Sequence, residues 1–312
     1  MIVYIIKRIL VSILLIFAVT FICFVFINMI PSDPAEVVLR VRQTPIITEE
    51  AIKEVTQALG LDDPYFIRYL KWLRNCLRLD FGVSYINPSR TVWGEFTRTL
   101  PDTILLALSS LIIVIIVSIP TGFFCAIFKD SLFDRVVRIL VFATTSMPAY
   151  VVGLLLMWLI SYRLKLLPTS GSGGFRHIIM PSITIAMTYI STYIRLIRNN
   201  MLENMKEDYV VYAKVRGLNP WRISIFHILK NSLQSCMVAI GMSIPQLISG
   251  TMVVENVFAW PGLGKLCIAS IFNRDYPIIQ LYILFVGILF VLFNLIFDIL
   301  QHLADPRIRS LS

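Results

Sequence analysis

The stretch ILLALSSLIIVIIVSIPTGFFCAIF, residues 104–128, decides the fold because it contains no charged residue. A helix of about 20 residues crosses the hydrocarbon part of a bilayer, so this stretch is long enough to be a span. The chain around it has 312 residues, of which 57% are hydrophobic and 15% are charged, whereas about 25% are charged in an ordinary soluble domain. The composition excludes a soluble globular protein and a disordered chain. It predicts a protein that crosses the membrane several times.

Five other stretches lack charged residues and approach or exceed the length of a span. They are residues 9–30, 139–162, 178–194, 231–254 and 278–297. The fourth span, 178–194, is the shortest, and we expect it to start near Pro181, since proline fits the first turn of a helix. Lys7 and Arg8 precede the first stretch as in a signal peptide, but that stretch lacks a small-residue cleavage site and is expected to remain as a span. The sequence therefore predicts an all-α membrane protein with six transmembrane helices.

The distribution of basic residues predicts the orientation of these spans. Fourteen Lys and Arg residues lie in four segments on one predicted side, and five lie in the two short loops on the other; the four segments are 1–8, 129–138, 195–230 and 298–312. Because basic residues favour the cytoplasmic side, both termini are expected to be cytoplasmic. The net charge of +9 then reflects orientation rather than nucleic-acid binding.

The predicted organisation has four parts. They are the N-terminus and first span (1–30), an extracytoplasmic helical segment (31–100), a five-helix core with a cytoplasmic loop at 200–230 (101–301), and a cytoplasmic tail (302–312). In the extracytoplasmic segment, Thr48 is expected to cap a helix that stops at Gly60. Asp63 is expected to cap a second helix with Pro64 in its first position, and this helix would run up to the break at Gly82.

Motifs for catalysis and metal binding are missing from the sequence. The piece Gly262-Leu-Gly264-Lys265 lacks the first glycine and the final hydroxyl of a phosphate-binding loop. The five cysteines form no CxxC pair, and the three histidines lie at or beyond the ends of the predicted spans. We therefore expect no enzymatic activity and no metal or cofactor bound by this chain. A transition metal that crossed here would cross as a chelate, since a bare ion needs imidazole or thiolate ligands.

A few residues in or beside the spans are candidates for a substrate pathway or an outer gate. Glu255 follows a fully apolar run, and ionisable residues near spans are often functional. Trp260, Pro261 and Gly262 predict a re-entrant or interfacial turn with the tryptophan among lipid headgroups. The complete set of candidates is Met147, Met242, Glu255, Asn256, Trp260 and Asp275. For the two methionines, packing inside the core is the more common role.

The loop between the fourth and fifth spans predicts a bent pair of short helices. Residues 202–216 suit a helix, and Gly217 suits a left-handed cap at its end. Asn219 and Pro220 then suit the cap and first residue of a second helix. Composition alone also allows a solvated basic loop, or one bound to anionic lipid.

The residues of this loop carry a family resemblance. The run Tyr212-Ala-Lys-Val-Arg-Gly217-Leu218, followed by His227-Ile-Leu-Lys-Asn231, resembles the "EAA" coupling loop of ABC importer permeases. The resemblance implies that the loop docks in a cleft on an ATPase subunit, through Tyr209, Tyr212, Ala213, Lys214, Arg216, Gly217 and Leu218. The family usually has a proline near Ser235, so the entry into the fifth span departs from the pattern.

The resemblance extends over the whole chain to the permeases for dipeptides, oligopeptides and nickel. Further matches are Leu59-Gly-Leu-Asp62-x-Pro64, Asp80-Phe-Gly82-x-Ser84, Ser146-Met-Pro148, His177-Ile-Ile-Met-Pro181, Arg195-Leu-Ile-Arg198 and Asp305-Pro-Arg307. Residues 250–264 and 271–277 are more similar to the nickel type, with Thr251, Asn256, Ala259, Phe272 and Asn273 carrying the distinction.

The family implies a function and partners for the chain. It implies a bacterial inner-membrane permease subunit of an ATP-driven importer, with nickel or a related divalent metal, as a small-molecule chelate, as cargo. A dipeptide or oligopeptide is the alternative cargo. The implied partners are a homologous permease subunit, two cytoplasmic ATPases that hold ATP and Mg²⁺, and an external solute-binding protein. A free-standing channel or secondary transporter is a rival of another class, but it would need polar residues at mid-span that are nearly absent from this sequence.

Overall fold

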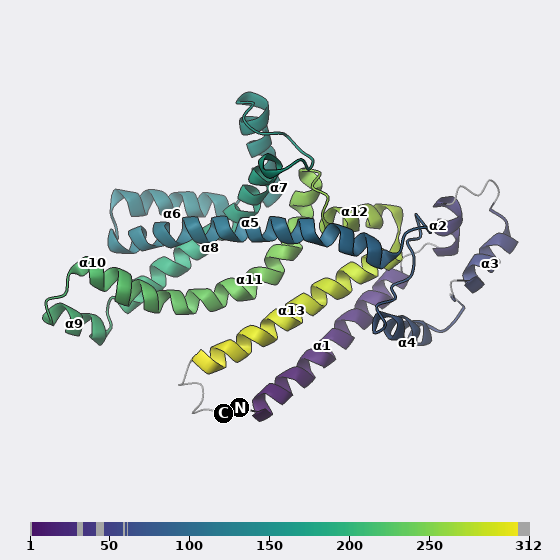
Figure 1. The fold of residues 1–312 in the computed structure, drawn as a ribbon, viewed down its shortest axis with the longest axis horizontal. Helices are drawn as coiled ribbons and strands as arrows, with labels where there is room; N and C mark the ends of the chain where they lie inside the picture. The colour runs from purple at the N-terminus through teal and green to yellow at the C-terminus, as the bar shows by residue number, and fades with distance from the viewer. Residues whose placement is uncertain (1, 30–33, 42–46, 59, 61, 305–312) are drawn as a thin grey trace. The chain divides into compact units, whose positions relative to one another are not determined.

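A computed structural model describes residues 2–29, 34–41, 47–58, 60 and 62–304 (Figure 1). Every regular element in these ranges is a helix, which confirms the all-α class. The chain divides into two compact units. The first unit combines the described residues of Met1–Asp102 with Gly262–Ile296, and the second combines those of Thr103–Pro261 with Phe297–Ser312. The predicted tail lies outside the described residues from position 305 onward, as does the motif that begins at Asp305.

Two sets of contacts organise the first unit. Its helices are α1 (Ile2–Asn28), α2 (Pro34–Val41), α3 (Glu49–Ala58), α4 (Tyr65–Cys76), the start of α5 (Val92–Ile127), α12 (Leu263–Asn273) and most of α13 (Tyr276–Ala304). One set lies between α1 and α4, and the other lies between α5, α12 and α13. Tyr69 of α4 packs its ring edge-on against Phe21 of α1, and the Tyr69 and Thr20 hydroxyls are 2.9 Å apart. A cluster of buried side chains joins the start of α5 to α12 and α13, and its members are Val92, Phe96, Leu263, Ile278 and Leu281.

The short helices of the first unit confirm one predicted boundary and correct two. Thr48 caps α3, because its hydroxyl accepts a hydrogen bond from the Ala51 amide at 3.2 Å. Asp63 does not cap α4; Pro64 occupies the cap position and the Asp63 carboxylate pairs with Lys71. The helix ends at Cys76 rather than at Gly82 because Leu79 adopts a left-handed conformation, with φ of 59°, that closes the last turn.

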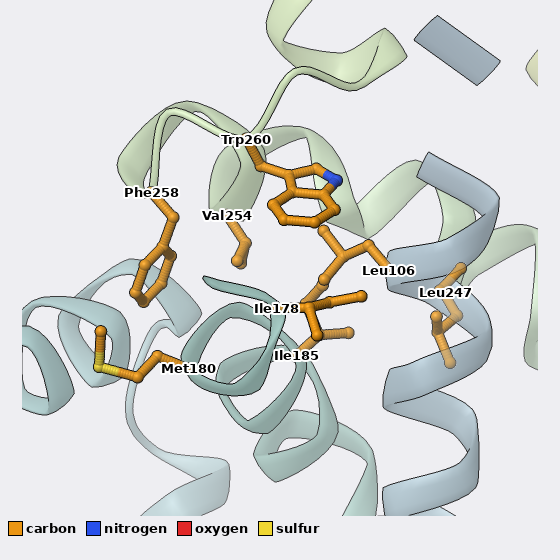
Figure 2. Packing of buried hydrophobic residues seen from close by; sticks show 9 residues of the cluster. Leu106, Ile178, Met180, Ile185, Leu247, Val254, Phe258 and Trp260 are labelled. Carbon is orange, nitrogen blue, oxygen red and sulfur yellow. The ribbon is translucent and has the colours of Figure 1, made fainter. Parts of the chain in front are cut away.

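The second unit is organised around one helix, α8 (Phe175–Asn204). Its other elements are the rest of α5, α6 (Leu132–Thr145), α7 (Ala149–Leu156), the π-helical η1 (Met157–Arg163), α9 (Asp208–Val215), α10 (Pro220–Ile223), the π-helical η2 (Ser224–Leu229) and α11 (Lys230–Val257). Helix α8 packs against α6, α7 and α11. A core cluster draws Leu106 from α5, Ile178 and Ile185 from α8 and Leu247 from α11 (Figure 2).

The structure does not confirm the six predicted spans one by one. Among the described residues, four helices are long and apolar enough to cross a membrane, or five if α6 with α7 and η1 counts as one broken span. The predicted span 139–162 is not continuous, because the chain bends by 106° between Thr145 and Ala149. Pro148 lies at this bend, where it lacks an amide hydrogen and keeps its predecessor out of the helical region.

The predicted fourth span differs in its start and its character. Helix α8 begins at Phe175, so Pro181 lies inside the helix and not in its first turn. Ser182, Thr184 and Ser191 are buried on this helix. These small polar side chains and the charged residues near the two ends of α8 lower its mean hydropathy below that of the other long helices. The small side chains also allow close packing with the neighbouring helices.

Candidate functional site

The stretch from the last residue of α8 to the residue before α11, residues 204–229, is the first candidate site, and it is called the coupling segment below. The predicted helix 202–216 is interrupted: α8 ends at Asn204 and α9 begins at Asp208. Glu207 stands in an extended conformation at the cap of α9. The Tyr209 hydroxyl donates to the Asn204 side-chain oxygen at 3.0 Å, so this interaction ties α9 back to the end of α8.

Both predicted turn residues of the coupling segment are confirmed. Gly217 has φ of +72°, its amide donates to the Lys214 carbonyl at 2.9 Å, and the Leu218 amide donates to the Ala213 carbonyl at 3.3 Å. This pair of hydrogen bonds is the Schellman closure of a helix. The Asn219 side chain accepts from the Trp221 amide at 2.9 Å, which caps the turn that starts at Pro220.

The coupling segment divides its side chains between an inner and an outer face. Val210 and Ala213 are buried in a cluster with Phe123, Met201 and Ile223, and Tyr209 and Leu218 pack against this cluster. On the outer face Tyr212 is 70% exposed and Val215 is 81% exposed. Lys214 and Arg216, the two neighbours of Val215 in the chain, are exposed as well. An exposed surface that combines apolar and basic side chains is typical of a binding site.

A buried ion pair that the sequence did not predict lies in the same unit. Arg198 of α8 donates two hydrogen bonds to the Asp134 carboxylate of α6, each at 2.8 Å. Asp134 is fully buried, and Arg138 approaches it at 3.6 Å. Such a two-pronged contact fixes both position and orientation. It holds α6 against α8 six residues before the coupling segment begins.

Glu255 is one of two proposed pathway residues that are fully buried, and the other is Asp275. Its carboxylate oxygen Oε1 accepts from the Thr103 hydroxyl at 2.7 Å and from the Thr251 hydroxyl at 2.8 Å, so it links α5 to α11. Asn256, the next residue, is exposed. These contacts give Glu255 partners inside the second unit, and its role in a pathway stays a prediction.

The turn after α11 corrects the predicted setting of Trp260. Ala259 is left-handed with φ of 52°, and the Trp260 amide donates to the Glu255 carbonyl at 2.8 Å, which confirms a turn before Gly262. Trp260 itself is only 4% exposed. Figure 2 shows its ring among Leu106, Ile178 and Val254, so it packs in the core and does not lie among lipid headgroups.

The two candidate methionines lie in different elements of the second unit. Met147 lies at the bend between α6 and α7, and Met242 lies in the middle of α11. Met147 is 36% exposed and Met242 is 37% exposed, so neither is a core residue of this chain. Whether they line a substrate pathway is a prediction that no contact in the described residues tests.

Asp275 belongs to the first unit, where it anchors a loop. The Ser84 hydroxyl donates to its Oδ2 atom, and the Tyr85 amide donates to its Oδ1 atom at 3.0 Å. Burial raises the pKa of the Asp275 carboxyl above its ordinary value, although the hydrogen bonds from Ser84 and Tyr85 favour the charged form. Asp275 therefore has a structural role that its proposed place in the pathway did not anticipate.

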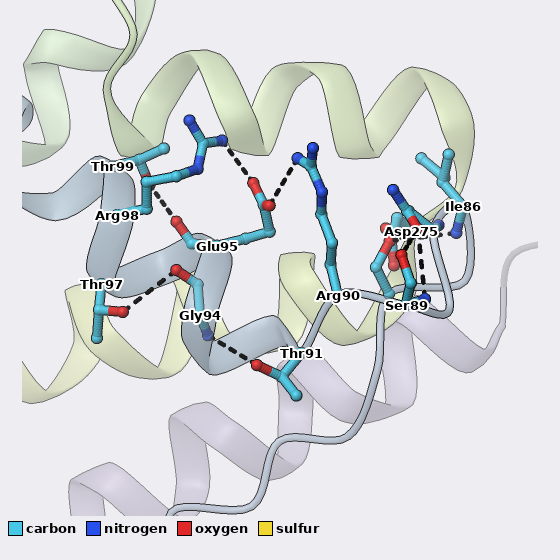
Figure 3. A network of polar contacts seen from close by, with 12 residues as sticks. Ile86, Ser89, Arg90, Thr91, Gly94, Glu95, Thr97, Arg98, Thr99 and Asp275 are labelled. Atoms are coloured by element: carbon cyan, nitrogen blue, oxygen red, sulfur yellow. Dashed lines mark hydrogen bonds and ion pairs between the residues drawn. The ribbon is translucent and has the colours of Figure 1, made fainter.

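A charged cluster lies beside this loop at the start of α5. Glu95 is nearly buried and is held between two arginines, Arg90 at 2.8 Å and Arg98 at 2.5 Å (Figure 3). The described residues contain no group of three or more His, Cys, Asp and Glu side chains arranged to hold a metal ion.

Comparison with known proteins gives the chain's relatives. The family model of the binding-protein-dependent transport system inner membrane component matches residues 118–310, and the N-terminal model of the same family matches residues 1–108. The metal-staphylopine import system permease protein CntB of Staphylococcus aureus is 36% identical over 310 residues, which is 98% of each chain. The oligopeptide transport system permease protein AppB of Bacillus subtilis is 34% identical, and the glutathione transport system permease protein GsiC of Escherichia coli is 32% identical, each over 98% of both chains.

These matches cover nearly the whole chain and agree with the apolar helices of both units. The resemblance predicted from the loop and the outer motifs is confirmed. The chain belongs to the family of binding-protein-dependent transport system inner membrane components, within the dipeptide/oligopeptide/nickel family of ABC importer permeases.

Proposed function

We propose that this chain is the permease subunit of an ATP-driven importer for a divalent metal bound to a small chelator. In this proposal two cytoplasmic ATPases hydrolyse ATP, a homologous permease completes the pathway, and an external solute-binding protein delivers the cargo. Both termini and the coupling segment face the cytoplasm, as the distribution of basic residues indicates.

The observation that carries the proposal is the form of the coupling segment. A closed turn at Gly217 and a cap at Asn219 fix two short helices on a buried apolar base. Because the inner face is anchored, a force applied to Tyr212 and Val215 would be transmitted to α8 and α11 rather than absorbed by a loose loop. The outer face is thus suited to dock on an ATPase and relay its closure.

The cargo is proposed from the sequence and the relatives. CntB is named as a metal-staphylopine import permease and covers this chain almost completely. The three histidines lie at or beyond predicted span ends, which favours a chelate over a bare ion. Oligopeptide and glutathione permeases are nearly as similar, so a peptide is the second candidate cargo.

The coupling role is tested by Val215→Glu in the complete transporter, reconstituted in vesicles with its ATPases. A carboxylate at the centre of an apolar contact is costly to desolvate, so we expect substrate-stimulated ATP hydrolysis to fall at least tenfold. Leu132→Glu is the matched control, because Leu132 is equally exposed at 79% but lies outside the coupling segment. Equal activity of both variants would contradict the proposed docking face.

The cargo is tested by uptake into cells that lack this chain, before and after the gene is restored. Radiolabelled nickel is supplied alone, with histidine and with a stronger chelator, and a labelled dipeptide is supplied in parallel. We expect restored uptake of chelated nickel only. Restored dipeptide uptake with unchanged nickel uptake would establish the peptide alternative, and uptake without the ATPases would favour a free-standing channel.

A further inference from the structure

Helix α6 buries little of its own surface in the second unit. Of its fourteen residues, only Asp134 and Val141 are buried. Its large apolar side chains are exposed, among them Leu132, Ile139 and Phe142. Lipid chains solvate such side chains as well as protein does, so apolar packing holds a helix of this kind only weakly in a membrane. The position of α6 must therefore depend on its polar contacts.

Two polar contacts join α6 to α8, one near each end of α6. Near the last residue of α6, the Thr144 and Ser191 hydroxyl oxygens are 2.5 Å apart. In the first turn, the Asp134 carboxylate accepts hydrogen bonds from the Nε and Nη2 atoms of Arg198, each at 2.8 Å. The ion pair is the stronger contact, because both partners are charged and two parallel hydrogen bonds join them. The start of α6 is thus held on α8 chiefly by Asp134 and Arg198.

The carboxylate of this pair is fixed within the first turn of α6. Ser131 caps the helix, since its hydroxyl accepts the Asp134 amide at 3.3 Å. The Asp134 carboxylate also accepts the Asp130 amide at 3.0 Å, and Arg138 approaches it at 3.6 Å. Asp134 therefore organises the turn between α5 and α6 as well as the contact with α8. A displacement of its partner is passed to the whole first turn of α6.

The arginine of this pair adjoins the base of the coupling segment. Ile197, the residue before Arg198, and Met201, three residues after it, are both fully buried. They belong to the cluster that also contains Val210 and Ala213 of α9. Closely packed interiors transmit displacements because they contain few voids. A shift of α9 therefore reaches Arg198 through packed side chains.

We propose that the Asp134–Arg198 ion pair is the positioning contact through which the coupling segment moves α6 during transport. With the pair intact, the coupling segment, the end of α8 and α6 move as one body. Without it, α8 still follows the coupling segment, but the start of α6 stays behind. The chain continues from α6 through the 106° bend into α7, which packs against α11, so a displacement of α6 extends further into the second unit. This inference rests on the proposed function, and it is independent of the identity of the cargo.

The test measures how many cargo molecules are imported for each ATP hydrolysed. The complete transporter is reconstituted in vesicles with its ATPases and binding protein, and radiolabelled nickel with histidine and a labelled dipeptide are supplied in parallel. Asp134→Asn keeps the size of the side chain and removes its charge. Removing one partner of a buried ion pair costs more than a tenfold change in an equilibrium requires, so we expect import per ATP to fall about tenfold.

The rate of ATP hydrolysis separates coupling from folding. The apolar base of the coupling segment does not include Asp134, so hydrolysis per assembled transporter is expected to change less than twofold in Asp134→Asn. A parallel loss of hydrolysis and import would show that the pair only stabilises the fold, and it would overturn the proposal. Arg198→Lys keeps the charge but loses the planar fork that holds the carboxylate, so we expect a smaller loss of import per ATP than in Asp134→Asn.

Two matched controls isolate the ion pair. Arg135→Gln removes a charge from the neighbouring position of α6, where the side chain is exposed. Thr144→Val removes the hydrogen bond between α6 and α8 at the other end of α6. Both controls are expected to keep the import per ATP of the unmodified transporter. A loss in either control that equals the loss in Asp134→Asn would contradict a specific role of the pair.

Hydrogen exchange of the purified chain tests the attachment of α6 without ATPases or cargo. In Asp134→Asn, the amides of α6 should exchange faster while those of α9 keep their rates, and unchanged exchange in α6 would overturn the inference. Failure of the proposed function gives a different result, since the unmodified transporter would then import neither cargo with ATP. Normal import that Asp134→Asn leaves unchanged per ATP would contradict the role of the ion pair alone.

Discussion

The coupling segment and the loop around Ser84 are both short, polar and rich in turns, yet they are held in different ways. The coupling segment is closed by local hydrogen bonds at Gly217 and Asn219, each between residues that are at most five positions apart. The Ser84 loop is held by Asp275, which lies 191 positions away from Ser84.

The two kinds of support leave different side chains of each segment exposed to a partner or to solvent. Local caps allow the coupling segment to turn Tyr212 and Val215 outward, because its backbone does not need those side chains for support. The Ser84 loop depends on a buried carboxylate, so the Ser84 hydroxyl and the Tyr85 amide point inward. The coupling segment is thus stabilised by its own caps, whereas the Ser84 loop is stabilised by a residue far away along the chain.

The largest effect is expected at the distant contact. Asp275→Ala leaves the Ser84 hydroxyl and the Tyr85 amide buried without their acceptor, at a cost of about 1–3 kcal/mol for each group. We expect a clear fall in the thermal unfolding midpoint of the purified chain. Asn273→Ala is the control, because Asn273 is an exposed neighbour whose side chain contacts only its own helix. An unchanged midpoint for Asp275→Ala would show that the loop has other support.

A smaller effect is expected at the local turn. Gly217→Val forces a branched side chain into a left-handed conformation, which costs about 1–2 kcal/mol. The space around Gly217 is open, so the cost comes from the backbone alone. We expect coupled ATP hydrolysis to fall while the unfolding midpoint changes little. Gly217→Asn should retain activity, since asparagine tolerates this conformation, and equal loss in both variants would point to a side-chain clash with the partner.

The cap at Asn219 should matter less. Replacing it with alanine removes one hydrogen bond to the Trp221 amide, worth about 1 kcal/mol at a helix start. We expect faster amide hydrogen exchange at Trp221 and Arg222 and a modest loss of coupled ATP hydrolysis. Asn219→Ser should restore both, because serine caps equally well, and unaltered exchange in the alanine variant would contradict the role of the cap.

The smallest effect is a dependence on pH. The raised pKa of Asp275 means that the folded chain holds this proton more tightly than the unfolded chain does. Its contribution to stability is therefore fully present below the unfolded pKa of about 3.9 and is lost as pH rises through the folded pKa. The unfolding midpoint of the unmodified chain, measured relative to Asp275→Asn, should fall as pH rises through this window. A difference in midpoint between the two chains that does not change with pH would contradict the raised pKa of Asp275.

Helix ends show how much of the fold could be predicted. The end of α9 was predicted because glycine marks a left-handed residue. The same pair of hydrogen bonds closes α4 at Leu79, the turn after α11 at Ala259 and α12 at Arg274, where no glycine is present. A left-handed residue with a side chain costs about 1–2 kcal/mol, so tertiary packing must compensate, and packing is not visible along the sequence.

The sequence by itself determined the membrane environment, the helical class and the caps of the coupling segment, because hydropathy and capping act between near neighbours. Only the tertiary structure decided that Trp260 is buried, that Asp134 pairs with Arg198, and that Asp275 holds Ser84. Asp134 and Arg198 are 64 positions apart in the chain, and Ser84 and Asp275 are 191 positions apart. A charge near a span end can meet water, lipid or a partner with similar energy, so the choice among them depends on which helices the fold brings together.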